Sequence, residues 1–239
     1  MRRAVLYLVM LALLMTVLAR PLTGDWVHEA AGVLLLAMLA AHTVAKRRWY
    51  LALSKGPWSL RRAASAAVNL SLIAAMTTVL VTAVPISRFV FGFLAIDNGM
   101  WVAQLHIAAA LWLFVLASVH LGFHWEPVKR VLPLPADGAV TSGGRVVGCG
   151  PAELCRPGVA GPLPASIRSG LLILACGFGA RACFNRNIGS KLIMYYSFDF
   201  FRAGDSVAGF IIDYLNMMVL FACVAHCVIN SMPARPSRA

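Results

Sequence analysis

The stretch from Gln104 to Trp125 constrains this chain most, because it is an apolar segment of membrane length that carries three histidines, His106, His120 and His124. Ionisable side chains inside such a segment are costly and rare, so each is a candidate for a functional role. His106 and His120 are 14 residues apart. On an α-helix that spacing rises about 21 Å and returns the side chains to within roughly 40° of one face. The stretch therefore predicts one helix with an imidazole near each membrane surface.

The composition places the chain in a membrane. Its 239 residues are 60% hydrophobic and 13% charged, with a mean hydropathy of +0.79, whereas a soluble domain is about half apolar and about a quarter charged. The net charge of +12 does not indicate nucleic-acid binding, because the basic residues lie between apolar runs, as in cytoplasmic loops. We therefore expect an all-α integral membrane protein with about six transmembrane helices.

Six apolar segments account for these helices. They cover residues 4–19, 26–44, 63–84, 104–125, 166–184 and 207–229. Pro21 and Gly24 mark a turn after the first segment, and Pro85 ends or kinks the third. The first segment follows a basic start, as in a signal peptide, but it is long and no clear cleavage site follows it. We therefore expect a retained helix.

The chain is expected to have three parts. Residues 1–125 hold four helices in an up-down bundle, residues 126–165 form a polar loop rich in Gly and Pro, and residues 166–239 hold a transmembrane hairpin. Six spans place both termini on the same side of the membrane. Fifteen of the 21 Lys and Arg residues fall on that side. This bias predicts a multi-pass protein of the cytoplasmic (inner) membrane with both termini in the cytoplasm. The last outer connection is an exception, since it carries four of the other six.

The second predicted helix carries His28 and His42, which are also 14 residues apart. This helix is expected to run parallel to the 104–125 helix. His28 would then lie at the depth of His106 near the outer surface, and His42 at the depth of His120 near the inner surface. Facing helices of a bundle are where core cofactors are ligated, and neutral imidazole is a standard axial ligand of heme. Two histidine pairs stacked across the membrane favour two b-type hemes.

Arginines near the helix ends are candidate partners for the heme propionates. Arg47, together with Arg48, would serve the inner heme, and Arg88 or Arg20 the outer one. Interfacial anchoring explains these arginines equally well. Gly32 either leaves room for a porphyrin face or packs against another helix.

Three roles are open to His124, one turn beyond His120. It could replace His120 as a ligand, bind a propionate, or serve a quinone site at the inner surface. The two histidines could also bind zinc or copper. With His226 of the last helix, they support an alternative to a heme protein, namely a metal or small-solute transporter. A third possibility is a heme-free assembly subunit. The metalloprotease motif HExxH is absent, because no second histidine follows His28-Glu29 at the required spacing.

The six cysteines form no CxxC or CxxCH motif, so they predict neither a zinc ribbon nor a c-type heme. Cys149 and Cys155 share the polar loop. They could pair, bind a metal, or remain exposed thiols in a reducing cytoplasm. The other four lie in or near apolar segments, where cysteine behaves as a small hydrophobic residue.

Several motifs resemble the flavinylation-associated cytochrome family. The resemblance covers most of residues 1–125 and, more loosely, residues 167–229, but not the loop over 127–164. The motifs that carry it are Leu22-Thr23-Gly24, His28-Glu29, Gly32, His42, Lys46-Arg47-Arg48-Trp49, Ser87-Arg88-Phe89-Val90-Phe91, His106, His120-Leu121-Gly122-Phe123-His124-Trp125, Asn187-Ile188-Gly189-Ser190 and Asp213-Tyr214-Leu215-Asn216-Met217-Met218.

This resemblance implies a membrane b-type cytochrome that passes electrons across the membrane. The implied partners are quinone and flavin-carrying or other redox proteins outside the cytoplasm. The implied ligands of the two hemes are His28, His42, His106 and His120. The chain would be an electron-transfer subunit without a catalytic residue of its own, and quinone oxidoreductase activity is left open.

Overall fold

The computed structural model describes residues 2–55, 58–94, 96, 99–125, 165–195 and 206–232. Within those ranges the chain is almost entirely helical and contains no strand. This confirms the all-α prediction for the part of the chain that is described. The predicted loop over 126–165, with Cys149 and Cys155, lies outside these ranges except for its last residue.

Six long helices form the described body, and each coincides with one predicted apolar segment. Most ends agree with the prediction within a few residues, although α2 begins earlier than expected. The long helices are α1 (Arg2–Leu18), α2 (Arg20–Ala45), α4 (Leu60–Ile86), α5 (Met100–Phe123), α7 (Ala165–Asn185) and α9 (Val207–Ser231). The short elements are α3 (Arg47–Leu51), α8 (Ile188–Leu192) and a 3-10 turn over Gly92–Leu94.

Four of these helices, α2, α4, α5 and α9, are long and apolar enough to cross a membrane. The apolar stretches of α1 and α7 are shorter, over Val5–Leu18 and Gly170–Asn185. Large apolar side chains are exposed along the helices; Val81, for example, is 64% exposed and Ile173 is 71% exposed. Surfaces of this kind fit a protein whose solvent is lipid. The prediction of six spans remains a prediction.

A break in the helical backbone lies between α1 and the body of α2. Gly24 has φ 83° and ψ 168°, a left-handed region that favours glycine because it has no Cβ. Pro21 lies in the first turn of α2, where its missing N–H costs nothing. The Arg20 guanidinium donates to the Asp25 carboxylate at 2.8 Å across this break. The predicted turn is therefore confirmed at Gly24.

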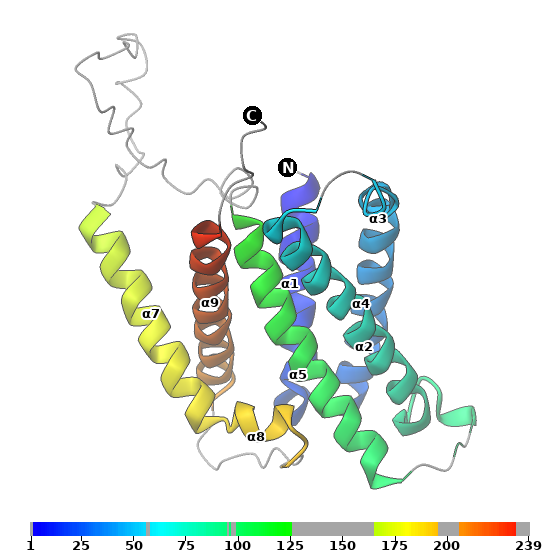
Figure 1. The fold of residues 1–239 in the computed structure, drawn as a ribbon. Coiled ribbons are helices and arrows are strands. Elements are labelled where there is room, and N and C mark those ends of the chain that lie inside the picture. The colour runs from blue at the N-terminus through cyan, green and yellow to red at the C-terminus, as the bar shows by residue number, and fades with distance from the viewer. Residues whose placement is uncertain are drawn as a thin grey trace, which may run out of the picture.

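Helix α5 lies at the centre of the molecule (Figure 1). It packs against α4 and against α9, while α1 packs along α2 and α7 along α9. The main core joins the predicted bundle to the C-terminal hairpin, and within it Phe114 and Met217 are completely buried. Its members are Met15, Ala19, Leu111, Phe114, Ala182, Ile188, Phe210, Tyr214, Met217 and Met218.

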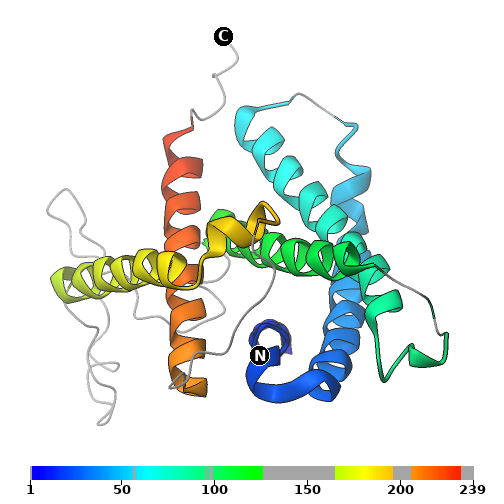
Figure 2. The same ribbon diagram turned by 90° about the horizontal axis from the view of Figure 1, so that it is seen from below.

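The described chain ends share one end of the molecule, as predicted. Figure 1 places the start of α1, the end of α9 and α3 at one end, and α8 and the turn between α1 and α2 at the other. Arg61 of α4 donates to the backbone carbonyls of Asn230 and Met232, both at 3.2 Å. These bonds tie α4 to the carboxyl end of α9. Viewed from below, α1 lies between α2 and α9 (Figure 2).

Two glycines permit close contact between helix backbones. A Cβ at Gly122 of α5 would collide with the backbone carbonyl of Ala222, and a Cβ at Gly179 of α7 would collide with that of Asn216. Small residues of this kind let membrane helices approach closely. By contrast, a Cβ at Gly177 would meet nothing within 4 Å. The close packing of α5 and of α7 against α9 therefore depends on a glycine in each helix.

The substitution Gly179→Ala is expected to lower the midpoint of thermal unfolding in detergent, because overpacking a tight contact costs about 1–3 kcal/mol. Gly177→Ala on the same helix is the matched control. It should leave the midpoint unchanged or raise it slightly, because Ala favours a helix over Gly by up to about 1 kcal/mol. Equal midpoints for the two variants would contradict the close contact at Gly179.

Candidate functional site

The structure brings His28 of α2 and His106 of α5 together. Their ring centroids are 6.2 Å apart and their planes are inclined by 71°. We call these two residues the outer pair. Their meeting agrees with the matched depth that the equal 14-residue spacings predict.

The arrangement at the other end of α2 and α5 is different. The ring of His42 lies 6.0 Å from that of Tyr7, and the ring of His120 lies 4.6 Å from that of His124. We call His42, His120 and His124 the inner cluster. His42 lies within electrostatic range of His120, but each ring packs against a different neighbour. The structure thus brings one of the two predicted pairs into ring contact.

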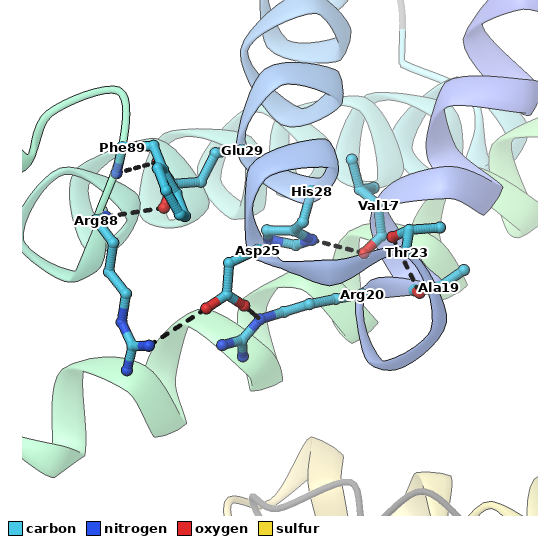
Figure 3. A network of polar contacts seen from close by, with 9 residues as sticks. All are labelled: Val17, Ala19, Arg20, Thr23, Asp25, His28, Glu29, Arg88 and Phe89. Atoms are coloured by element: carbon cyan, nitrogen blue, oxygen red, sulfur yellow. Dashed lines mark hydrogen bonds and ion pairs between the residues drawn. The ribbon is translucent and has the colours of Figure 1, made fainter.

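A backbone carbonyl fixes the tautomer of His28. The Nδ1 atom of His28 lies 2.8 Å from the carbonyl oxygen of Val17 (Figure 3). Val17 is in the last turn of α1, where carbonyls have no partner within the helix. Because a carbonyl can only accept, Nδ1 carries the proton and Nε2 keeps its lone pair. The turn between α1 and α2 therefore orients the ring and leaves Nε2 as a free ligand atom.

The hydroxyl of Thr82 does the same for His106. The Nδ1 atom of His106 lies 3.1 Å from Oγ1 of Thr82. The Thr82 hydroxyl donates to the carbonyl of Thr78 at 2.7 Å. With its proton on that carbonyl, the hydroxyl oxygen accepts from the Nδ1–H of His106, and Nε2 of His106 keeps its lone pair.

Helix α4 also supplies a partner for His120. The Oδ1 atom of Asn69 accepts from Nδ1 of His120 at 2.8 Å. Asn69 and Thr82 are both buried on α4, and they lie 13 residues apart, close to the spacing of the two histidines on α5. The sequence reasoning missed both residues. The available signal was a lone amide in a helix of Ala, Leu and small residues, since such groups are rare inside a membrane.

The outer pair fits two imidazoles bound to one metal ion. A metal–imidazole nitrogen bond is about 2 Å. With ring centroids 6.2 Å apart, the two imidazoles are close enough for both to bind one ion. Among the described residues, α2 and α5 are not a closely packed pair, so the rings bridge the two helices. This donor set suits a bis-imidazole heme iron.

One lysine is within electrostatic range of the inner cluster. The charge of Lys46 is within interaction range of all three of its histidines. Lys46 follows His42 by one helical turn, so the two share a face. Burial, together with the charge of Lys46, lowers the pKa of His124, which follows the last residue of α5. The sequence offers Arg47 and Arg48 as candidates for the inner propionates, and Lys46 is a further candidate.

The predicted arginines lie at several positions. Arg47 and Arg48 line an open depression on α2 with small apolar residues. Arg20 and Arg88 contact the two carboxylate oxygens of Asp25, at 2.8 and 3.4 Å (Figure 3). Arg20 is also within interaction range of both residues of the outer pair. Of Arg20 and Arg88, Arg20 is therefore the better candidate for a propionate partner at the outer pair.

Gly32 lies on the face of α2 that packs against α1. A Cβ at this position would lie 3.9 Å from Cγ1 of Val17, which is an ordinary packing distance. This contact favours the helix-packing interpretation over a role in making room for a porphyrin.

His226 does not join the inner cluster. Its ring lies 6.4 Å from that of Trp125, and its Nε2 lies 3.0 Å from Nδ2 of Asn230. In the part of the chain that is described, no group of three or more His, Cys, Asp and Glu residues could hold a metal ion. His120, His124 and His226 therefore do not form such a group in these residues.

Comparisons with protein families, with curated proteins and with solved structures found no match to this chain. The resemblance to flavinylation-associated cytochromes is therefore carried by its motifs alone.

The meeting of α2 and α5 can be tested without any cofactor. In a background whose six native cysteines are replaced by Ala, a His28→Cys/His106→Cys variant should be joined by a short bifunctional thiol reagent, because the ring centroids are only 6.2 Å apart. The matched control is His28→Cys/His120→Cys, whose positions are separated along α5 by about 21 Å of helical rise. Peptide mass analysis identifies the linked pair. Equal yields for the two variants, or none above the single-cysteine variants, would contradict the geometry.

Proposed function

We propose that this chain is a membrane b-type cytochrome. It carries electrons across the cytoplasmic membrane between quinone or quinol and a redox partner outside the cytoplasm, a flavin-carrying one by the family resemblance. The observation that carries the proposal is the outer pair, in which imidazoles from two helices lie 6.2 Å apart. Both have Nδ1 bound to a fixed acceptor and Nε2 free.

The histidines are assigned as ligands of two hemes. His28 and His106 hold one iron, and His42 and His120 hold the other. A bound heme supplies a one-electron ferric/ferrous couple. The two histidines of α5 are separated by about 21 Å of helical rise, which is most of the thickness of the bilayer core of about 30 Å.

The surrounding residues orient the ligands and supply charge. Hydrogen bonds from the second ring nitrogen fix a ligand's orientation and raise its basicity. Val17, Thr82 and Asn69 have this role. Arg20 at the outer end and Lys46 at the inner end are the cations placed to neutralise propionates by charge-assisted hydrogen bonds.

His124 is assigned to quinone binding at the inner end. His120 already has the fixed orientation that a ligand needs, because Asn69 binds its Nδ1. His124 lies beside it, with ring centroids 4.6 Å apart, and is thus available to donate a hydrogen bond to a quinone oxygen. The inner cluster would then hold both a heme ligand and a quinone-binding residue.

Electron transfer is tested in liposomes that contain the purified protein, an impermeant ferric acceptor inside and a quinol analogue outside. We expect the acceptor to be reduced faster than in empty liposomes, because the two heme sites together span the membrane. His106→Ala and His42→Ala should each lose one heme and abolish this rate. His226→Ala, outside both sites, is the control and should retain it. A wild-type rate equal to that of empty liposomes would contradict the function.

The hydrogen-bond partners on α4 make a separate prediction. Thr82→Val should weaken heme binding at the outer site about 10–100-fold and leave the inner site intact, and Asn69→Leu should do the reverse. Groups that hydrogen-bond the second nitrogen of a ligating imidazole contribute that much to a metal site. Titration of the apoprotein with heme measures both. Thr77→Val is the matched control, since Thr77 is on the same helix and, among the described residues, donates to the carbonyl of Ile73. Loss of both hemes in either variant would refute the assignment.

A further inference from the structure

The carboxylate of Glu29, on α2, holds the chain segment that follows α4. It accepts hydrogen bonds from one side chain and three successive backbone N–H groups, and Figure 3 shows the bonds to Arg88 and Phe89. The four donors are the hydroxyl of Ser87 at 2.7 Å and the N–H groups of Arg88 at 2.8 Å, Phe89 at 3.0 Å and Val90 at 2.9 Å.

These bonds use both carboxylate oxygens. Oε1 accepts from Arg88, and Oε2 accepts from the other three donors. Successive backbone N–H groups that converge in this way form an anion-binding concavity. Bonds to an ionised acceptor are roughly twice as strong as bonds between neutral groups. Glu29 therefore fills an anion site that the backbone after α4 creates.

This contact joins two parts of the fold that otherwise pack little. Within the described residues, the close partner of α2 among the long helices is α1, whereas α4 packs along α5. Near the outer pair, α2 meets the segment after α4 through Glu29, through the ion pair between Asp25 and Arg88 at 3.4 Å, and through the rings of Trp26 and Phe89, whose centroids are 6.0 Å apart. Glu29 follows His28 directly in the sequence, so a change in its anchorage moves the backbone that carries the histidine.

We propose that Glu29 is a positioning residue, which clamps α2 to the segment after α4 and thereby sets the separation of His28 and His106. Its effect on heme rests on the proposed function, whereas the clamp itself is a property of the chain alone.

The clamp is tested by hydrogen exchange of peptides covering residues 88–90 in the purified protein. In Glu29→Gln, an NH2 group that cannot accept a hydrogen bond replaces one carboxylate oxygen. The backbone amides of residues 88–90 should therefore exchange about tenfold faster than in the wild type. Ser87→Ala removes one of the four donors to Glu29, together with the acceptor of the Phe91 N–H, and is a second variant. Asp213→Asn is the matched control, because it breaks an ion pair with Arg186 at 2.9 Å in the C-terminal hairpin. Unchanged exchange at residues 88–90 in Glu29→Gln would overturn the clamp.

The positioning role is tested by the cross-linking of His28→Cys/His106→Cys described above. Adding Glu29→Gln should lower the cross-linking yield, and adding Asp213→Asn should not. An equal yield with and without Glu29→Gln would overturn the positioning role. This result holds whether or not the protein binds heme, so it is independent of the proposed function.

A redox titration gives the corresponding heme readout. In Glu29→Gln, the midpoint potential of one heme should rise, because an anion near its ligand is lost, while the other stays unchanged. Equal shifts of both hemes, or none, would overturn a local role for Glu29. A wild-type protein without heme would instead refute the proposed function and leave the exchange and cross-linking results to decide the clamp.

Discussion

The arrangement of the site depends on one constraint: imidazole nitrogens buried among apolar helices need hydrogen-bond partners. An unpaired polar group in such surroundings is costly, so each ring must find an acceptor. His28 uses the free carbonyl of Val17, His106 uses the hydroxyl of Thr82, and His120 uses the amide oxygen of Asn69. In all three cases Nδ1 is occupied and Nε2 is released. The same hydrogen bonds that satisfy these rings within the fold also leave a nitrogen lone pair available on each of them, as the proposed heme ligation requires.

Helix α5 can present its histidines because it is fixed on both sides. Its contact with α4 supplies the acceptors Asn69 and Thr82, and its contact with α9 depends on Gly122, where a side chain would collide with the backbone of Ala222. Helix α2 has less support, since it packs mainly on α1. The clamp that we propose at Glu29 supplies a link from α2 to the segment after α4, close to the point where His28 meets His106.

The sequence predicted the features that follow from helical periodicity and hydrophobicity. The helices over 63–84 and 207–229, and the meeting of His28 with His106, required only a period of 3.6 residues and a parallel arrangement of two helices. It did not predict Asn69, Thr82 or Glu29 as partners, because those roles depend on which faces of the helices meet. The inner cluster also departed from the expected symmetry, since packing sets His42 against Tyr7 and His120 against His124. Periodicity fixes the depth of a side chain, but not its neighbour.

The central claim is that the four histidines hold two b-type hemes. It is tested most directly by the reduced-minus-oxidised absorption spectrum of the purified wild-type protein, together with its heme content, after expression with an adequate heme supply. The account predicts the absorption bands of a low-spin b-type cytochrome and two hemes per chain. The absence of a b-type band under these conditions would contradict it.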